Sequence, residues 1–222
     1  MTTTDLTPRE AVDAAQEIII EQTYTPQSDP DALWLVERVD DWLELNQKPR
    51  DSKGWFHASS LGRSDDDLIA MYRGKYVDRG HDAVTLRVFD LGHDRDRSWK
   101  RYMTRTGLST VKGKAARRIK LPHMRLVGEC DDIVRDPDGN LWVVEVKTIN
   151  PYLWSNLKRP KPEHILQVHV YMAALAIHRS IVLYECKSTQ RVLAFSVPFD
   201  AETWAGIVRR LCDLRLEAER VG

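Results

Sequence analysis

The sequence predicts an α/β fold in which a mixed central β-sheet is flanked by helices, with a helical appendage at the N-terminus. Short apolar runs bounded by turn residues, which are typical of strands, alternate with longer stretches whose apolar residues recur at helical spacing. The order helix, strand, strand, strand, helix, strand, strand, helix is typical of a sheet covered by helices on both faces. A chain of 222 residues can bury one substantial core. We therefore expect one domain with an appendage.

Two helices precede the core domain, which we place at residues 55–222. The first is expected over residues 5–22 and the second over about residues 31–46, each with apolar residues at helical spacing. The polar segment 47–54 links them to the core. We expect residues 1–54 to form a helical appendage that packs on the core domain.

The first part of the core is predicted to be mainly helical. One helix is expected within residues 56–76, with Ser59 or Ser60 as its N-cap, and a longer one over about residues 83–103. Residues 104–120 combine two glycines with many basic and small residues. That composition predicts a mobile, solvent-facing segment that clamps a nucleic-acid backbone through phosphate contacts.

Two apolar runs joined by an Asp-Pro-Asp-Gly turn form the centre of the core. The second run delivers Glu145 and Lys147, whose side chains share one face because strand residues alternate. A hairpin with so short a turn brings Asp131, at the end of the first run, close to Glu145. Two carboxylates beside a lysine suit metal-dependent phosphodiester hydrolysis, because oxygen ligands bind Mg²⁺ and the ammonium meets the phosphate charge. The structural alternative is a turn-forming aspartate followed by a solvated strand edge.

The chain after this hairpin is predicted to complete the sheet. Prolines keep residues 150–162 in an extended loop. A helix over residues 163–178 places Gln167 and Tyr171 one turn apart on one face, although Tyr171 also fits a half-buried packing position. Strands at 181–186 and 192–197 and a helix from about 200 to 220 follow.

The charge distribution predicts phosphate contacts, although the formal net charge is zero. Residues 97–125 contain ten lysines or arginines and no aspartate or glutamate. A single-signed stretch in a neutral protein indicates a nucleic-acid contact, with a solvated basic face as the alternative. The loop at 150–162 adds further basic residues. The candidate DNA-binding residues are Lys112, Lys114, Arg117, Arg118, Lys120, Lys158, Arg159 and Lys161.

Several of these residues recur in the order of a known motif. They are Gly128, Asp131, the Asp-Gly turn, Glu145, Val146, Lys147, Gln167 and Tyr171. This set resembles the motif of the PD-(D/E)XK nuclease superfamily, and it is similar to the branch with RecB-type nuclease domains, Cas4 proteins and phage-encoded recombination exonucleases. The resemblance covers roughly residues 56–199.

The resemblance implies a role for each motif residue. Asp131, Glu145 and the carbonyl of Val146 would bind one or two Mg²⁺ or Mn²⁺ ions, while Lys147 orients or activates the attacking water and offsets phosphate charge. The glutamine and tyrosine of the motif would position the DNA strand. Asp132 competes with Asp131 for the metal, but the spacing to the motif glycine favours Asp131.

A further metal ligand is expected on the helix at 83–103. The family segment Gly-x-x-x-His, whose histidine binds metal, is matched only in part at Gly92. The fourth residue after Gly92 is Asp96, and the histidine is displaced to His93. Aspartate is a hard oxygen donor that suits Mg²⁺ or Mn²⁺, and the two residues share a helical face, so both are candidates. For His93, a surface or capping role is the alternative.

Cysteine content and hydropathy exclude other classes. Cas4-like relatives often carry an iron–sulfur cluster on four cysteines, whereas this chain has three, at wide spacing, so we expect no cluster. No apolar run approaches the ~20 residues of a membrane span, and the N-terminus lacks a secretory signal pattern. We expect a cytoplasmic protein without a membrane partner.

We therefore expect an Mg²⁺- or Mn²⁺-dependent deoxyribonuclease, first of all an exonuclease that acts on duplex DNA ends in recombination or repair. A structure-specific endonuclease is the nearest alternative. A DNA-binding or scaffolding module is the other, if the displaced histidine marks lost metal binding. The resemblance leaves room for a homo-oligomer and for a recombination partner protein, and the sequence specifies neither.

Overall fold

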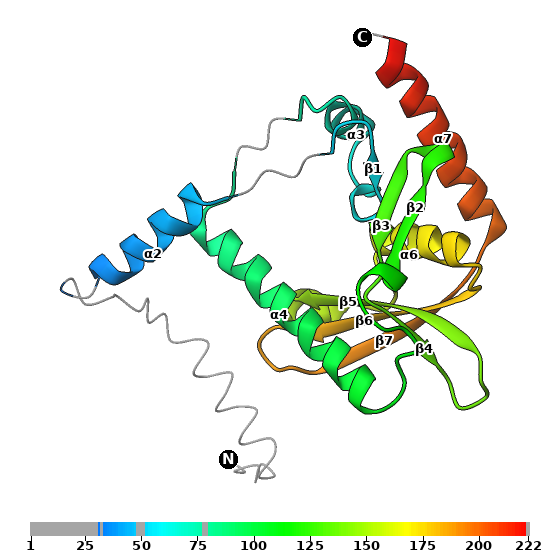
Figure 1. Ribbon diagram of the computed structural model, residues 1–222. Helices are drawn as coiled ribbons and strands as arrows, with labels where there is room; N and C mark the ends of the chain where they lie inside the picture. The colour runs from blue at the N-terminus through cyan, green and yellow to red at the C-terminus, as the bar shows by residue number, and fades with distance from the viewer. Residues whose placement is uncertain (1–30, 32, 48–51, 77–79, 221–222) are drawn as a thin grey trace, which may run out of the picture. The chain divides into compact units, whose positions relative to one another are not determined.

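The computed structural model describes residues 31, 33–47, 52–76 and 80–220 (Figure 1). The chain divides into two compact units, residues 1–42 and 43–222. The helix predicted at residues 5–22 lies outside the described residues. Helix α2 (Leu33–Leu45) forms where the second helix is predicted, and none of its residues is buried.

The larger unit contains two sheets rather than one. The three-stranded sheet has the order β1-β3-β2, with β3 (Leu126–Glu129) parallel to β1 (Phe56–His57) and antiparallel to β2 (Arg118–Leu121). The four-stranded sheet has the order β4-β5-β6-β7, formed by β4 (Asp132–Arg135), β5 (Leu141–Ile149), β6 (Arg179–Cys186) and β7 (Val192–Pro198). Its central pair β5 and β6 is parallel and the outer pairs are antiparallel, so this sheet is mixed as predicted.

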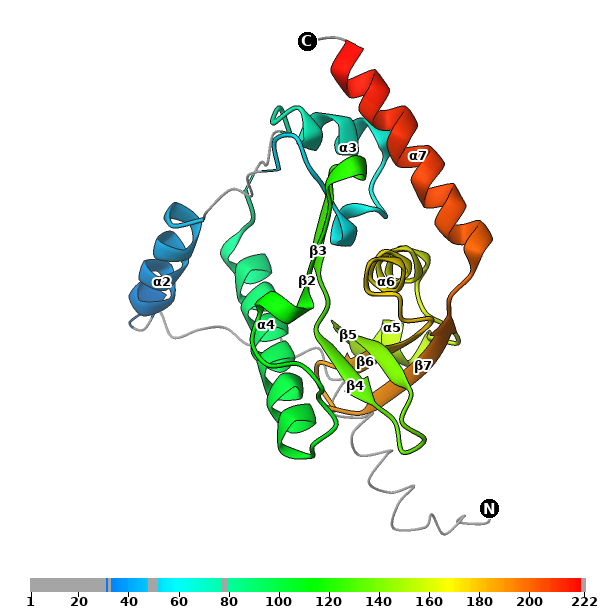
Figure 2. The same cartoon turned by 45° about the vertical axis from the view of Figure 1, so that its right-hand side comes forward.

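Helices cover both faces of the four-stranded sheet (Figure 2). On one face, α6 (Pro162–Leu175) contacts β5 and β6, and α7 (Ala201–Arg220) packs against α6. This side holds the larger core, which includes Val143 and Tyr184. On the other face, α4 (Ala83–Arg105) covers a smaller core that includes Val144 and Val146. Val143 and Val144 point into different cores because successive strand side chains alternate between faces. A mixed sheet covered by helices on both faces confirms the predicted fold class.

The segment predicted as one helix at residues 56–76 is composite. It contains β1, the 3₁₀ turn η2 (Ala58–Ser60) and helix α3 (Asp65–Tyr72). The N-cap of α3 is Ser64, whose side chain accepts a hydrogen bond from the backbone N–H of Asp67, so the prediction of Ser59 or Ser60 is wrong. Pairing of β1 with β3, a partner distant in sequence, overrides local helical preference here.

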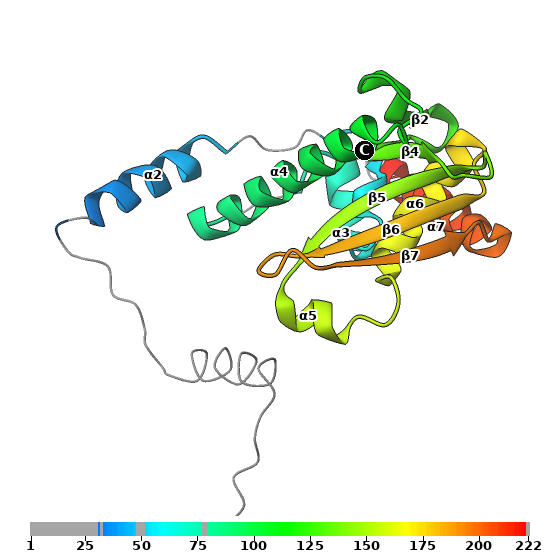
Figure 3. The same ribbon diagram turned by 90° about the horizontal axis from the view of Figure 1, so that it is seen from below.

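Two segments predicted to be irregular are ordered. Within residues 104–120, Thr110 N–H donates to the Ile133 carbonyl at 2.8 Å, and the chain then enters β2. The predicted extended loop contains helix α5 (Pro151–Asn156), which lies near the sheet in Figure 3. Asn150 caps α5 by accepting a hydrogen bond from Leu153 N–H, and its proline stands in the first turn, where a missing N–H costs nothing.

Two further observations concern the hydropathy of the helices and the exposure of the cysteines. Among the described residues, none of the helices combines the length and apolar character that a bilayer crossing needs. Cys130 and Cys186 are buried thiols, and Cys212 is an exposed one.

Candidate metal and nucleic-acid site

The site begins where the chain passes from one sheet to the other. Only Cys130 and Asp131 separate β3 from β4. Strand β4 pairs with β5 as far as Val144, so residues 145–149 have no strand neighbour on that side among the described residues. The side chain of Asp131 takes that place, because its Oδ2 accepts a hydrogen bond of 2.7 Å from Val146 N–H. Asp131 is thereby fixed beside the free edge of β5.

A buried network surrounds the glutamate of β5. Glu145 is only 3% exposed, and its Oε1 lies 2.6 Å from Nζ of Lys147. The same oxygen accepts a hydrogen bond of 2.8 Å from Nε2 of Gln167, and Nε2 also donates to the Tyr171 hydroxyl at 2.8 Å. Helix α6 thus delivers Gln167 to the carboxylate that binds the lysine, and Tyr171, one turn later, to the amide of that glutamine.

Close packing explains the glycine of the motif. A Cβ atom at Gly128 would lie 2.8 Å from Cε1 of Tyr171 and 3.0 Å from the Cβ of Ala58. Any side chain at this position would push the tyrosine ring away from the network. Gly128 therefore positions Tyr171 through close approach of the β3 backbone.

Helix α4 brings its own polar residues to this edge. A cleft of about 520 Å³ is lined by Asp96 and His93 from α4 together with Asp131 and the 145–148 segment of β5. Lys100, one turn after Asp96, places its Nζ 2.8 Å from Asp96 Oδ2 and 3.5 Å from Asp131 Oδ1. His93 lines the same cleft with an exposed side chain. The structure therefore collects Asp96, Asp131, Glu145, Val146 and Lys147 around one cleft.

The electrostatics of the cleft fit a divalent cation. Burial raises the pKa of Asp131 well above its usual value, and the charges of Glu145 and Asp96 raise it further. Burial likewise raises the pKa of Glu145, against the opposing effect of Lys147. Glu145 Oε2 and Asp96 Oδ1 are buried without a hydrogen-bond partner in the described part of the chain. A cation held by these oxygens would relieve the repulsion and would give the oxygens a partner.

The acidic side chains of the cleft do not form a closed set of metal ligands in the described part of the chain. Within the described ranges, no group of three or more histidine, cysteine, aspartate or glutamate side chains has the geometry of a metal site. The ammonium of Lys100, paired with both Asp96 and Asp131, stands between α4 and the acids of the hairpin. Candidates to hold Mg²⁺ or Mn²⁺ are Asp131, Glu145, the carbonyl of Val146, Asp96 and His93, all of which line the cleft.

The structure separates the two neighbouring aspartates. Asp132 is 1% exposed, and its Oδ1 accepts hydrogen bonds from the Ser109 hydroxyl and from Ile133 N–H. Asp132 is absent from the lining of the cleft, whereas Asp131 faces it. Asp132 thus secures the segment before β2 to β4.

A second cavity, of about 560 Å³, lies on the three-stranded sheet. Its lining includes His57 and Ser59 from the first strand and turn, Arg118 and Lys120 from β2, and Tyr171. Through Gln167, the tyrosine connects this cavity with the carboxylate of the cleft. His57 and Ser59 were not predicted as site residues from the sequence, because their segment was predicted to be helical.

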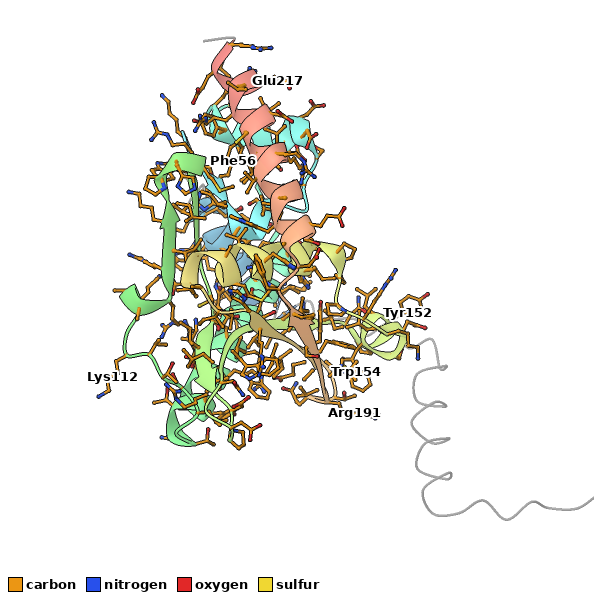
Figure 4. The ribbon with its side chains drawn as sticks, turned by 90° about the vertical axis from the view of Figure 1, so that its right-hand side faces the viewer. Phe56, Lys112, Tyr152, Trp154, Arg191 and Glu217 are labelled. Atoms are coloured by element: carbon orange, nitrogen blue, oxygen red, sulfur yellow. The ribbon has the colours of Figure 1, made fainter. Side chains whose placement is uncertain are left out.

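The candidate DNA-binding residues form two separate groups. In the first, Arg118 and Lys120 line the second cavity, while Lys114 and Arg118 approach Glu129 at 3.5 and 3.7 Å. Lys112 is exposed, and Arg117 is half-buried. Figure 4 shows Lys112 on the opposite side of the molecule from Tyr152 of α5. The second group follows α5: exposed Lys158 and Arg159, and Lys161 at the start of α6.

A buried ion pair that the sequence analysis missed holds α4 on the sheet. Glu185 of β6 is 1% exposed, and its carboxylate lies 2.5 Å from Arg95 Nη2 and accepts a hydrogen bond of 2.5 Å from Trp99 Nε1. Both partners flank Asp96 on α4. The available signal was a glutamate within an otherwise apolar strand, because buried charges need partners.

Comparison with known proteins bears on the fold. No protein-family model and no curated protein sequence matches the chain. Similar solved structures include an alkaline exonuclease, LHK-Exo, from Laribacter hongkongensis, with a TM-score of 0.55 and 18% identity over 76% of this chain and 90% of that one. SSO0001 has a TM-score of 0.52 and 16% identity, covering 82% and 86%. LHK-Exo in complex with dAMP has a TM-score of 0.51 and 17% identity, covering 83% and 95%. At identities this low, the likeness shows a shared fold alone, and the family resemblance of the motif stays a prediction.

Proposed function

We propose that this chain is a metal-dependent DNA nuclease, and first of all an exonuclease that acts on duplex ends. The observation that carries the proposal is the convergence of Asp131, Glu145 and Lys147 on one cleft, in which buried carboxylate oxygens have no hydrogen-bond partner among the described residues. The exonuclease preference is supported by the likeness in fold to a protein described as an alkaline exonuclease. Recombination or repair is the process we propose for it.

Each residue has a role that its environment supports. Bound by the carboxylates and the carbonyl of Val146, Mg²⁺ or Mn²⁺ would supply Lewis-acid stabilisation of the phosphate and activation of the attacking water. Burial by itself lowers the pKa of Lys147, but Glu145 and Asp131 outweigh it and raise that pKa above its usual value. The lysine is therefore a cation at neutral pH, suited to bind a phosphate oxygen and offset the charge that develops there.

The network on α6 orients the reacting groups. Gln167 fixes Glu145 by donating to Oε1, and the same amide holds the Tyr171 hydroxyl. Burial, reinforced by the charge of Glu145, raises the pKa of Tyr171 well above its usual value, so it stays a neutral hydroxyl. Since Tyr171 lines the second cavity, we place the DNA backbone between that cavity and the cleft.

Basic residues of β2 provide the affinity for DNA in this proposal. Arg118 and Lys120 line the second cavity, where they would contact phosphates without reading sequence. Such contacts make binding strongly dependent on salt. A protein of similar fold is described in complex with dAMP, which supports a nucleotide or nucleic-acid ligand for this chain.

The deciding experiment compares linear and circular duplex DNA with Mg²⁺, Mn²⁺ or EDTA. Wild type is tested beside Lys147→Ala, with Lys75→Ala, an exposed lysine outside both cavities, as the matched control. Metal-dependent loss of linear DNA alone, abolished by Lys147→Ala and kept by the control, supports the exonuclease. Nicking of circles supports the endonuclease. Intact DNA with a retained mobility shift contradicts catalysis and leaves a DNA-binding module.

A further inference from the structure

Lys100 occupies an unusual position within the acidic cleft. It lies one turn after Asp96 on α4, and its side chain is 23% exposed. Its Nζ contacts Asp96 Oδ2 at 2.8 Å and Asp131 Oδ1 at 3.5 Å. A positive charge is therefore held between carboxylates from two different elements, on the side of Asp131 that faces α4.

Lys100 and Lys147 bracket the three carboxylates from different sides. Lys147 pairs with Glu145 Oε1, and Asp131 Oδ2 is taken by a backbone N–H. The oxygens left without a hydrogen-bond partner in the described residues are Glu145 Oε2 and Asp96 Oδ1. The oxygens available to bind a metal ion are therefore one from Glu145 and one from Asp96. The ammonium of Lys100 already lies between Asp96 and Asp131.

We propose that Lys100 is a resident cation that takes the place of a second divalent ion, so that the cleft binds one metal ion per chain. The inference rests on the proposed metal-dependent nuclease function and deepens it. In two-metal nucleases, two ions about 4 Å apart share a carboxylate. Here Asp131 would be the shared acid, and the ammonium of Lys100 lies 3.5 Å from its Oδ1.

Local charge favours a single ion. The three carboxylates Asp96, Asp131 and Glu145 and the two lysines paired with them sum to one negative charge. One divalent ion makes the sum +1, which a single DNA phosphate neutralises, whereas two ions with both lysines in place would leave an excess of +3. Cations this close repel strongly in a partly buried site, because the effective dielectric constant there is far below that of water. A second ion would have to displace Lys100 from both of its partners.

The test measures metal binding without DNA, so that it does not depend on nuclease activity. Calorimetric titration with Mn²⁺ gives the stoichiometry and dissociation constant, and thermal unfolding in EDTA gives the stability of the metal-free protein. The variants are Lys100→Met, which removes the charge, and Lys100→Arg, which keeps it. Lys187→Met is the matched control, because Lys187 lines the same cleft without an ion pair to either aspartate among the described residues.

We expect wild type, Lys100→Arg and Lys187→Met to bind one Mn²⁺ per chain. Lys100→Met should bind a second equivalent or bind the first at least about tenfold more tightly, and should melt at a lower temperature in EDTA. Two ions per wild-type chain would overturn the inference while leaving the nuclease proposal intact, even if Lys100→Met does not fold. Unchanged stoichiometry and affinity in a folded Lys100→Met protein would also overturn it. Absence of any Mn²⁺ binding by wild type would overturn both proposals.

Discussion

The carboxylate of Asp131 accepts a hydrogen bond of 2.7 Å from the backbone N–H of Val146, at the point where β5 loses its neighbouring strand. A side chain thus satisfies a backbone donor that a strand would otherwise satisfy. The acid is held in place by the main chain and does not depend on a metal ion for its position. The same arrangement places Asp131 beside the carboxylates of Glu145 and Asp96. Their mutual repulsion lowers the stability of the metal-free protein.

Replacing Asp131 with asparagine should therefore stabilise the protein in EDTA. The amide oxygen can accept the same hydrogen bond from Val146, while the repulsion among buried carboxylates is relieved. We expect a gain of about 1 kcal/mol in the free energy of unfolding, a typical value when a strained functional site is relaxed. Denaturant unfolding in EDTA measures it. The stabilisation that Mn²⁺ gives to wild type should vanish in the variant, and a variant less stable than wild type in EDTA would refute this account.

The contribution of Asp131 and Glu145 to the stability of the metal-free protein should fall as pH rises. The pKa values of Asp131 and Glu145 are raised in the folded state, so the unfolded chain releases these protons first. The penalty is absent below about pH 4, the ordinary carboxyl pKa, and is complete above the raised pKa values. The difference in melting temperature between wild type and Asp131→Asn in EDTA should widen across that window. In wild type the shift caused by Mn²⁺ should grow with pH, because protons then compete less with the metal.

The parts of the site that the sequence predicted lie close together in the chain. Glu145 and Lys147 share a face because strand side chains alternate, and Gln167 and Tyr171 share a face because a helix turns every 3.6 residues. These periodicities are local, and the structure brings all four together. Their roles in catalysis remain predictions.

What the sequence did not predict depends on partners distant in the chain. The residues that form β1 read as helix, because their strand neighbour lies some seventy residues later in the chain, at Leu126. Lys100 appeared only as one member of a basic stretch, and its pairing with Asp131 exists only once α4 crosses the free edge of β5. One local feature was also missed: the prolines of residues 150–162 suggested a loop, whereas the side chain of Asn150 caps a helix that begins at Pro151.

Gly128→Ala should impair both folding and catalysis. The added methyl group would meet Tyr171 at 2.8 Å and Ala58 at 3.0 Å, and both of these residues are buried in the core. Overpacking of this kind destabilises by about 1–3 kcal/mol. Displacement of the ring should also disturb the hydrogen bond to Gln167, so activity should fall in the fraction that remains folded. Denaturant unfolding and nuclease assays below the transition measure the two effects.

The matched control for that change is Gly206→Ala. Gly206 lies in helix α7, where a Cβ would have nothing within 4 Å. Alanine stabilises a helix interior by roughly 0.5–1 kcal/mol relative to glycine. Opposite signs for the two variants support close approach at Gly128. Equal stabilisation of both would show that Tyr171 can move aside freely.

Glu185→Gln should weaken metal binding from a distance, by loosening α4. The substitution leaves Arg95 without its buried counter-charge and weakens the hydrogen bond from Trp99, which together hold the helix on β6. Because Arg95 is partly exposed, we expect a loss of about 1–3 kcal/mol in stability rather than the full cost of an isolated buried charge. Asp94→Asn, which breaks the exposed ion pair with Arg97 on the same helix, should change stability by less than about 0.5 kcal/mol.

Since Asp96 lies between the two anchoring residues, Glu185→Gln should need more Mn²⁺ for half-maximal stabilisation and for half-maximal activity, with the rate at saturating Mn²⁺ largely kept. A loss of rate that added Mn²⁺ does not restore would mean that Glu185 acts on the reacting groups by another route than the placement of Asp96.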